Sequence, residues 1–250
     1  MAGTYNKTFL DQVIARVDFA SDLLIKESLP DTVAREAVKR FPISEPKKAF
    51  LAELRLKGGD ISAQKIETRT EWNFHGKERE KSLCITSSWM WVAYKKYQSF
   101  TILRDDFLGV LSELFKVYCE TVVIKRLGLR YINRFRISEG DSTDWSGFFE
   151  SNMLPIPKIV KDRKTLSRSF HTVEMNYGDE RLKVQYGMHN PDFPATIRSK
   201  EFMLDLDAFF EGLQDETEVK TNLETFHNHI KEVFEESITD KLREEMNKNG

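Results

Sequence analysis

The stretch RLGLRYINRFRI, Arg126 to Ile137, contains four arginines and no acidic residue. Its alternation predicts a β-strand, because side chains two residues apart share one face. The apolar face, which we expect in the core, is formed by Leu127, Leu129, Tyr131, Phe135 and Ile137. The other face carries a row of arginines that we call the Arg stripe: Arg126, Arg130, Arg134 and Arg136. On this second face Gly128 predicts a bulge or a close backbone approach.

The first half of the chain contains further strand and helix signals. Val13 to Phe19 alternates strictly between apolar and polar residues, which predicts a half-buried strand. A helix is expected next, with Asp31 or Thr32 as its N-cap and Pro42 as its stop. The remaining predicted elements are two extended segments that form a hairpin, followed by a helix that is apolar on most of its circumference: Ile61 to Phe74, Lys81 to Tyr94, and Asp105 to Thr121.

The second half shows a similar order of signals. Its predicted elements are a connecting loop, 138–164, with one short helix around Trp145 to Glu150; a hairpin of Ser167 to Tyr177 and Arg181 to His189; a strand, EFMLDLDAF; and one long helix with an apolar seam from Leu223 to Met246. In the strand, alternation directs Leu204 and Leu206 inward and Asp205 and Asp207 outward.

These signals predict an α+β fold, with antiparallel sheet packed against long amphipathic helices, because strands and helices arrive in groups and not in βαβ alternation. One compact domain, 1–250, is expected, since this length can bury a substantial core. Both portions contain a hairpin followed by a long helix. This order predicts two similar packed halves, about 1–137 and 165–250, joined by the segment 138–164.

The composition is typical of a folded cytoplasmic protein. Hydrophobic residues make up 40% and charged residues 31%, and the formal net charge of −2 does not draw the molecule to nucleic acid or anionic lipid. No apolar run approaches the roughly 20 residues that a membrane helix needs, and no signal-peptide pattern is seen. Cys84 and Cys119 lie in apolar segments and are expected to be reduced, buried thiols. We therefore expect a cytoplasmic location and no membrane partner.

Familiar catalytic motifs are missing. The sequence contains no phosphate-binding glycine loop and no HExxH, CxxC or GxSxG pattern. His227 and His229 are two residues apart on a predicted helix, so they point in different directions and cannot chelate one ion. No cofactor and no metal site is expected. These absences favour a non-catalytic role without deciding the question.

Asp205 and Asp207 are the nearest feature to a catalytic pair. Their spacing of two residues puts both carboxylates on one face of a strand. Such a pair can hold Mg²⁺ for phosphoryl chemistry. It can equally pair with basic residues on a neighbouring strand, where opposite charges stabilise strand pairing by a few tenths of a kcal/mol.

The Arg stripe has the same two interpretations. Four arginines on one strand face repel one another unless negative charge lies opposite. That charge can be supplied by carboxylates of the protein, with Asp18, Asp205 and Asp207 as candidates, or by an external anion. Arginine suits phosphate and carboxylate ligands because its planar fork donates two parallel hydrogen bonds.

Two more features polarise the charge of the molecule. A second basic cluster occupies the predicted connection and consists of Lys158, Lys161, Arg163, Lys164 and Arg168. It forms either a solvated loop or, with the Arg stripe, a nucleic-acid footprint. Glu211 to Glu245 holds eleven acidic and four basic residues, a net charge of −7. Polarity of this kind favours steering of a partner or self-association.

Trp89 and Trp91 fall on one face of a predicted strand. They predict either a wide apolar pocket or a core hairpin that packs on the helix around Phe107 to Tyr118.

Five segments carry a resemblance to a known family. They are LGLRYINR at Leu127 to Arg134, the opening YNKTFLDQVIARVDF, YGMHNPDFP, FMLDLDAFF, and the ending HNHIKEVFEESITDKLREEM. In this order, and over almost the whole chain, they resemble a sporadically distributed prokaryotic family of this length whose hallmark is an LGLRYIN strand. The family has no assigned function, so the resemblance implies no catalytic residues. Its patchy distribution is typical of mobile accessory genes such as toxin–antitoxin or defence components.

Three functions are compatible with these features. The leading hypothesis is a cytosolic binding or interaction protein, antitoxin-like or defence-associated, whose Arg stripe and acidic C-terminal helix contact a protein partner or a second copy. The second is a metal-dependent enzyme in which Arg130, Arg134 and Arg136 hold a phosphate-bearing substrate and Asp205 with Asp207 holds the metal. The third is a nucleic-acid-binding module, whose affinity would fall steeply with salt.

Overall fold

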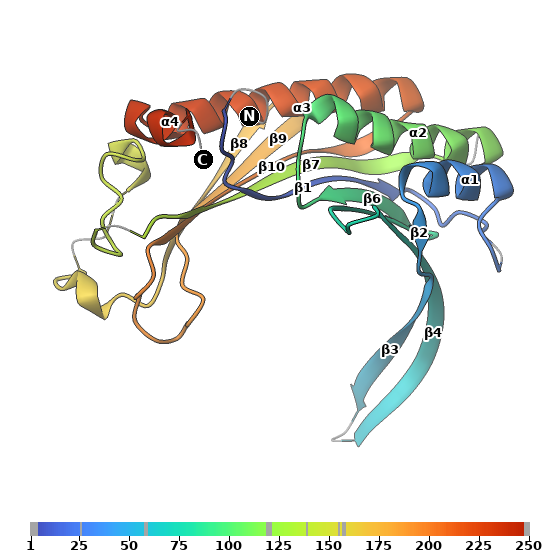
Figure 1. Cartoon of the computed structure of the whole chain (residues 1–250). Helices are drawn as coiled ribbons and strands as arrows, with labels where there is room; N and C mark the ends of the chain where they lie inside the picture. Colours follow the sequence, from blue (N-terminus) through green and yellow to red (C-terminus); the bar gives the residue numbers. More distant parts are fainter. Residues whose placement is uncertain are drawn as a thin grey trace.

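The computed structural model confirms the α+β class, with helices on one face of an antiparallel sheet (Figure 1). It describes residues 5–25, 27–57, 60–118, 122–138, 140–154, 156 and 159–247, and within these it describes the backbone alone for 50–57 and 60–69. The strands are β1 (Leu10–Phe19), β2 (Ile43–Ser44), β3 (Lys47–Lys57), β4 (Asp60–His75), β5 (Lys81–Ile85), β6 (Trp89–Tyr94), β7 (Ile124–Arg136), β8 (Ser169–Tyr177), β9 (Glu180–Met188) and β10 (Glu201–Gln214). The α-helices are α1 (Asp31–Arg40), α2 (Phe100–Tyr118), α3 (Glu216–Ser237) and α4 (Asp240–Asn247).

The strands form one sheet in the order β2-β4-β5-β6-β1-β7-β10-β9-β8, and β3 pairs with β4 off this path. The chain repeats one order of elements twice. The first repeat is β1, a connection that contains α1, β2 and β3, the meander β4-β5-β6, and helix α2. The second repeat is β7, a connection, the meander β8-β9-β10, and helix α3. Strands β1 and β7 lie side by side at the centre of the sheet. On each side of this pair the meander strands follow in reverse chain order, β6-β5-β4 beside β1 and β10-β9-β8 beside β7. The Arg-bearing strand therefore opens the second repeat, whereas the expected halves assigned it to the first.

One face of the sheet is buried under the helices, as the alternation predicted. Val13, Ala15 and Val17 of β1 are fully buried, and so are Leu127, Leu129, Tyr131 and Phe135 of β7. The facing helices bury residues spaced three and four apart, among them Leu103, Phe107 and Leu111 of α2 and Leu223, Phe226 and Ile230 of α3. Each large apolar side chain contributes about 1.5–3 kcal/mol on burial, so this interface dominates the stability of the fold.

Three predicted elements in the first half differ in detail. Helix α1 has Pro30 as its N-cap and no side-chain cap, so the expectation of Asp31 or Thr32 is wrong. Helix α2 begins at Phe100 and not at Asp105. The expected strand over 81–94 is two strands, β5 and β6, because the Thr86 hydroxyl accepts hydrogen bonds from the backbone amides of Ser88 and Trp89 and bends the chain.

The long hairpin of β3 and β4 was not predicted. The predicted hairpin between the strand from Ile61 to Phe74 and the segment that follows does form, because β4 pairs with β5. The longest ladder of β4, however, is formed with β3. The hairpin extends away from the rest of the sheet (Figure 1).

Two elements in the second half also differ. No helix forms around Trp145 to Glu150, where Trp145 and Phe149 are buried in the core and a short 3₁₀ turn, Ser151–Met153, follows. The expected single C-terminal helix is broken after Ser237, whose hydroxyl donates to the Val233 carbonyl while Ile238 is extended. The apolar seam nevertheless continues, since Leu242 and Met246 of α4 are buried.

Cys84 is a buried free thiol, as expected, and burial raises its pKa to about 12. Cys119 lies outside the described residues.

Candidate functional site

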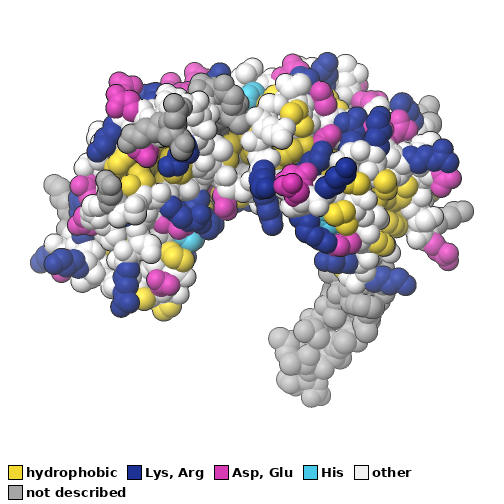
Figure 2. All heavy atoms as spheres, viewed as in Figure 1, with side chains coloured by type: hydrophobic (Ala, Val, Ile, Leu, Met, Phe, Trp, Pro, Cys, Tyr) yellow, Lys and Arg dark blue, Asp and Glu magenta, His cyan; other side chains and the backbone are white. Residues whose placement is uncertain are grey.

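The candidate site lies on the face of the sheet opposite the helices, which we call the open face. A hollow of about 560 Å³ is found there across β6, β1, β7 and β10, lined by Gln12, Ile14, Arg16, Asp18, Trp91, Ala93, Arg126, Gly128, Arg130 and Asp207. In Figure 2 basic and acidic side chains gather at the underside of the middle of the sheet. The hollow therefore lies at the junction of the two repeats.

Strand register explains why these side chains meet. Arg16 lies opposite Gly128, and Asp18 lies opposite Arg126. Asp207 of β10 lies opposite Arg130. Side chains of directly opposed residues share one face of a sheet, so every second residue of each strand contributes to the hollow.

Gly128 makes room for an arginine at the floor of the hollow. A Cβ atom added to Gly128 would lie 3.0 Å from Nη1 of Arg126. This is the close approach that the sequence predicted, and the partner is the preceding arginine of the stripe.

Arg130 and Asp205 form a two-pronged ion pair. Nε of Arg130 donates to Oδ1 of Asp205 at 2.8 Å and Nη2 donates to Oδ2 at 2.5 Å. The Asp205 side chain is only 5% exposed, whereas Arg130 is 42% exposed. Hydrogen bonding to Asp205 raises the pKa of the Arg130 guanidinium. For this arginine the internal partner named among the alternatives is the one found.

Arg134 and Arg136 share a carboxylate that was not among the partners expected from the sequence. Nε of Arg136 lies 2.9 Å and Nε of Arg134 lies 3.4 Å from the carboxylate of Glu201, which is buried. Nδ1 of His189 lies 2.7 Å from the same group. Glu201 precedes Asp205 by four residues on the same strand face, so extending the period of two would have found it.

Arg126 differs from Arg130 and Arg136, which donate hydrogen bonds to Asp205 and Glu201. Arg134, outside the hollow, has ion pairs at 3.4 and 3.7 Å but makes no side-chain hydrogen bond to a described residue. The guanidinium of Arg126 lies 3.7 Å from Asp207, 3.9 Å from Glu211 and 4.0 Å from Asp18, beyond hydrogen-bond range. Its carbon lies 4.8 Å from the ring centre of Phe209. Within the described part of the chain no hydrogen bond is made by its guanidinium, so its donors are available to the hollow.

Asp207 is a second charged side chain of the hollow that makes no hydrogen bond to a described residue. It lines the hollow, and within the described residues its carboxylate accepts no hydrogen bond. Burial raises the pKa of this carboxyl, and the nearby arginines only partly oppose that effect. A group that loses water without gaining a hydrogen bond is costly, so Asp207 would gain from a ligand that donates.

The aromatic wall comes from β6. Trp89 and Trp91 stack with their ring centres 6.5 Å apart, and Trp91 lines the hollow. Arg16 lies 5.2 Å above Trp89 and donates to Asp18, with 2.6 Å between Nη2 and Oδ1. Trp91 thus lines a hollow and does not pack on the helices, but the lining is mostly polar and charged, unlike the wide apolar pocket that was one of the two expectations. The residues of β6 that face the helices are instead Met90 and Val92.

The second basic cluster takes no part in the hollow. Lys161, Arg163, Lys164 and Arg168 are exposed in the connection before β8. Arg168 lies 4.4 Å above the ring of Phe193 in the loop before β10. Lys158 lies outside the described residues. The two basic groups therefore do not combine at this site.

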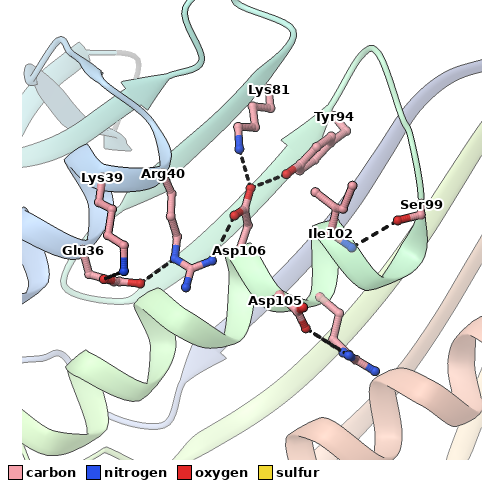
Figure 3. A network of polar contacts seen from close by, with 10 residues as sticks. Glu36, Lys39, Arg40, Lys81, Tyr94, Ser99, Ile102, Asp105 and Asp106 are labelled. Atoms are coloured by element: carbon pink, nitrogen blue, oxygen red, sulfur yellow. Dashed lines mark hydrogen bonds and ion pairs between the residues drawn. The ribbon is translucent and has the colours of Figure 1, made fainter.

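A buried polar network supports the site from the helix side and was not foreseen (Figure 3). Asp106 of α2 is buried and accepts hydrogen bonds from Lys81 at 2.6 Å, from Arg40 at 3.0 Å and from the Tyr94 hydroxyl. Burial, with the bond to Asp106, raises the pKa of Tyr94. The network ties β5 and β6 to α1 and α2, so it holds the strand that carries Trp91.

Within the described residues no group of three or more His, Cys, Asp or Glu side chains could hold a metal ion. None of the described helices has the length and apolar character to cross a bilayer.

No protein-family model matches the chain, and no match is found among the curated proteins. The resemblance carried by the LGLRYIN strand therefore stays a prediction.

Proposed function

We propose that this is a binding protein that holds a small phosphate-bearing ligand with a flat ring in the hollow of the open face. The observation that carries the proposal is the pair of Arg126 and Asp207. Both line the hollow, 3.7 Å apart, and neither makes a hydrogen bond to another described residue, while Arg130 and Arg136 are hydrogen-bonded to acidic side chains.

The lining favours a ligand with three kinds of group. An arginine fork recognises phosphate or carboxylate. A carboxylate with unused acceptor capacity recognises a hydroxyl or amino group, and the Trp91 ring recognises a flat apolar group. Nucleoside monophosphates carry all three. The volume of about 560 Å³ falls in the usual range for small-molecule sites, about 300–1,000 Å³.

The enzyme hypothesis has less support from this geometry. Both oxygens of Asp205 are occupied by Arg130, so a metal held by Asp205 and Asp207 would first have to displace an internal ion pair. Breaking this pair, in which the arginine is 42% exposed, costs about 2 kcal/mol.

The nucleic-acid hypothesis also has less support. The charges of the open face are mixed in sign, and non-specific binding to nucleic acid depends on an excess of basic charge. A cytoplasmic location and an antitoxin-like or defence-associated role stay predictions that ligand binding would accommodate.

Isothermal titration with the four nucleoside 5′-monophosphates, the matching nucleosides and inorganic phosphate tests the proposal. Arg126→Gln and Asp207→Asn are expected to weaken binding of the best monophosphate by about 10- to 100-fold, because each removes charge-assisted hydrogen bonds. Trp91→Ala should weaken the monophosphate and leave phosphate unchanged.

Arg181→Gln is the matched control. Arg181 lies on β9, is 52% exposed and pairs with Glu211, but it does not line the hollow. Equal affinity in Arg126→Gln and Arg181→Gln, or no binding of any of these probes to the wild-type protein, would overturn the proposal.

A further inference from the structure

The last strand of the sheet, β8, has an unpaired edge. Its nine residues pair with β9 in continuous register and with no other described strand. Tyr177 and Glu180 flank a two-residue turn, so they exchange hydrogen bonds, and every second residue before Tyr177 also bonds to β9. The backbone N–H and C=O groups of Phe170, Thr172, Glu174 and Asn176 consequently point outward. Among the described residues, none of these groups has a backbone partner on another segment.

This edge lacks the features that normally prevent strand addition. Monomeric proteins protect an edge with lysine, proline, a bulge or a covering element. The sequence SFHTVEMNY has no proline and no basic residue apart from histidine, and its only acidic residue is Glu174. On the helix-side face of β8, the ring of Tyr177 stacks on His229 of α3 with 4.4 Å between ring centres, and no described helix makes more than this local contact with the strand in the main packing of the fold. Val173 and Tyr177 there are 44% and 45% exposed.

We propose that β8 pairs antiparallel with β8 of a second copy of this chain, about a twofold axis at Val173. In this register all nine residues are paired, because Val173 is the midpoint of the strand. The outward-pointing residues meet one another, Thr172 with Glu174 and Phe170 with Asn176. About eight backbone hydrogen bonds join the copies, two for each of the four facing pairs.

The side chains are also compatible with self-pairing. Val173 faces Val173 across the axis, in the closely spaced kind of pair where the Cα atoms are about 4.5 Å apart. Glu174 faces Thr172, so no like charges are directly opposed. A segment of unrelated sequence could use the same backbone groups, but a second copy satisfies both strands at once.

The pairing has a consequence for the open face. A twofold axis through an antiparallel strand pair is perpendicular to the sheet, so both copies present the same face on the same side. The two hollows of a dimer would therefore open in one direction.

Analytical ultracentrifugation of the full chain over a range of concentrations tests the proposal. The wild-type protein is expected to form dimers. Thr172→Pro removes an outward N–H from each copy without touching the ladder to β9, and Val173→Lys opposes two charges at the axis. Each is expected to raise the dimer dissociation constant about tenfold or more. The matched control is Val38→Lys, because Val38 of α1 is 43% exposed and far from this edge in the chain.

Cross-linking tests the register. Val173→Cys should form a disulfide between copies under mild oxidation, since the expected separation of Cα atoms lies in the range that disulfides accept. Val38→Cys should not. A wild-type protein that stays monomeric, a dimer insensitive to both Thr172→Pro and Val173→Lys, or a dimer that Val173→Cys fails to cross-link would overturn the proposal.

Discussion

His227 should make the stability of the fold depend on pH. Its ring lies on α3, stacked on Phe100 with 4.2 Å between ring centres, and its Nδ1 lies 3.0 Å from the Tyr131 hydroxyl. Tyr131 is fully buried and also lies 2.7 Å, hydroxyl to hydroxyl, from Tyr97. Burial lowers the pKa of His227 from 6.5 to about 4.

The lowered pKa means that the folded state holds His227 neutral while the unfolded state takes up a proton below pH 6.5. The unfolded chain then binds more protons, so the free energy of unfolding falls as the pH drops from about 6.5 toward 4. With these two pKa values the loss at pH 5 is about 2 kcal/mol. The full loss below pH 4 approaches about 3 kcal/mol, at 1.36 kcal/mol for each pKa unit.

Urea unfolding at pH 7.5 and pH 5.0 measures this loss. His227→Phe and His227→Gln remove the titrating ring, so the variants should lose about 2 kcal/mol less than the wild-type protein between the two pH values. Tyr97→Phe is the control, because it removes a hydroxyl of the same cluster and keeps His227. It should lower stability by about 1 kcal/mol at both pH values. A wild-type pH dependence that survives in both His227 variants would refute the reasoning.

Three further outcomes are expected from the same structure. Asp106→Asn should lower the free energy of unfolding by about 3 kcal/mol, because two cations and a tyrosine lose a charged partner and one of its two acceptor oxygens. Asp105→Asn, at a side chain that is 56% exposed, should cost less than about 1 kcal/mol. Asp205→Asn should lower the free energy of unfolding by about 2 kcal/mol, because it breaks the ion pair with Arg130. Asp207→Asn should change it by no more than about 0.5 kcal/mol, because that carboxylate is desolvated and makes no hydrogen bond to a described residue. Equal losses for the two variants in urea unfolding would contradict this difference. Cys84 should resist alkylation at pH 8 until urea unfolds the chain, because its pKa is about 12 and the thiolate is the reactive form; rapid labelling of the native protein at Cys84, identified by mass spectrometry, would contradict it.

Local sequence predicted the faces of the strands but not their partners. The alternation in β1, β7 and β10 indicated correctly which residues are buried, because a period of two is a property of one strand alone. It could not show that Glu201 and not Asp207 lies against Arg136, since strand register depends on residues far apart in the chain. The missed hairpin of β3 and β4 has the same cause. Helix ends were missed where tertiary contacts override local signals, as at Ser237.

The tryptophans show the same division. The spacing of Trp89 and Trp91 indicated that they share one face of their strand. Both faces of this strand carry apolar residues, so the sequence could not show which face packs against the helices. Met90 and Val92 pack under the helices, and Trp91 is left to line the hollow.

By itself the sequence determined the α+β class, the buried and open faces of β7 and β10, and the concentration of arginine on one of them, because these depend on the side-chain periods of single elements. Only the tertiary structure decided which stripe arginine of the hollow keeps its donors. Arg130, Arg134 and Arg136 meet Asp205 or Glu201 within 3.4 Å, while Arg126, at 3.7 Å or more from every described carboxylate around it, does not. That difference arises chiefly from strand register, which depends on residues far apart in the chain and is not encoded within the strand itself; the glycine that leaves space beside Arg126 is visible in the sequence, but not which side chain fills that space.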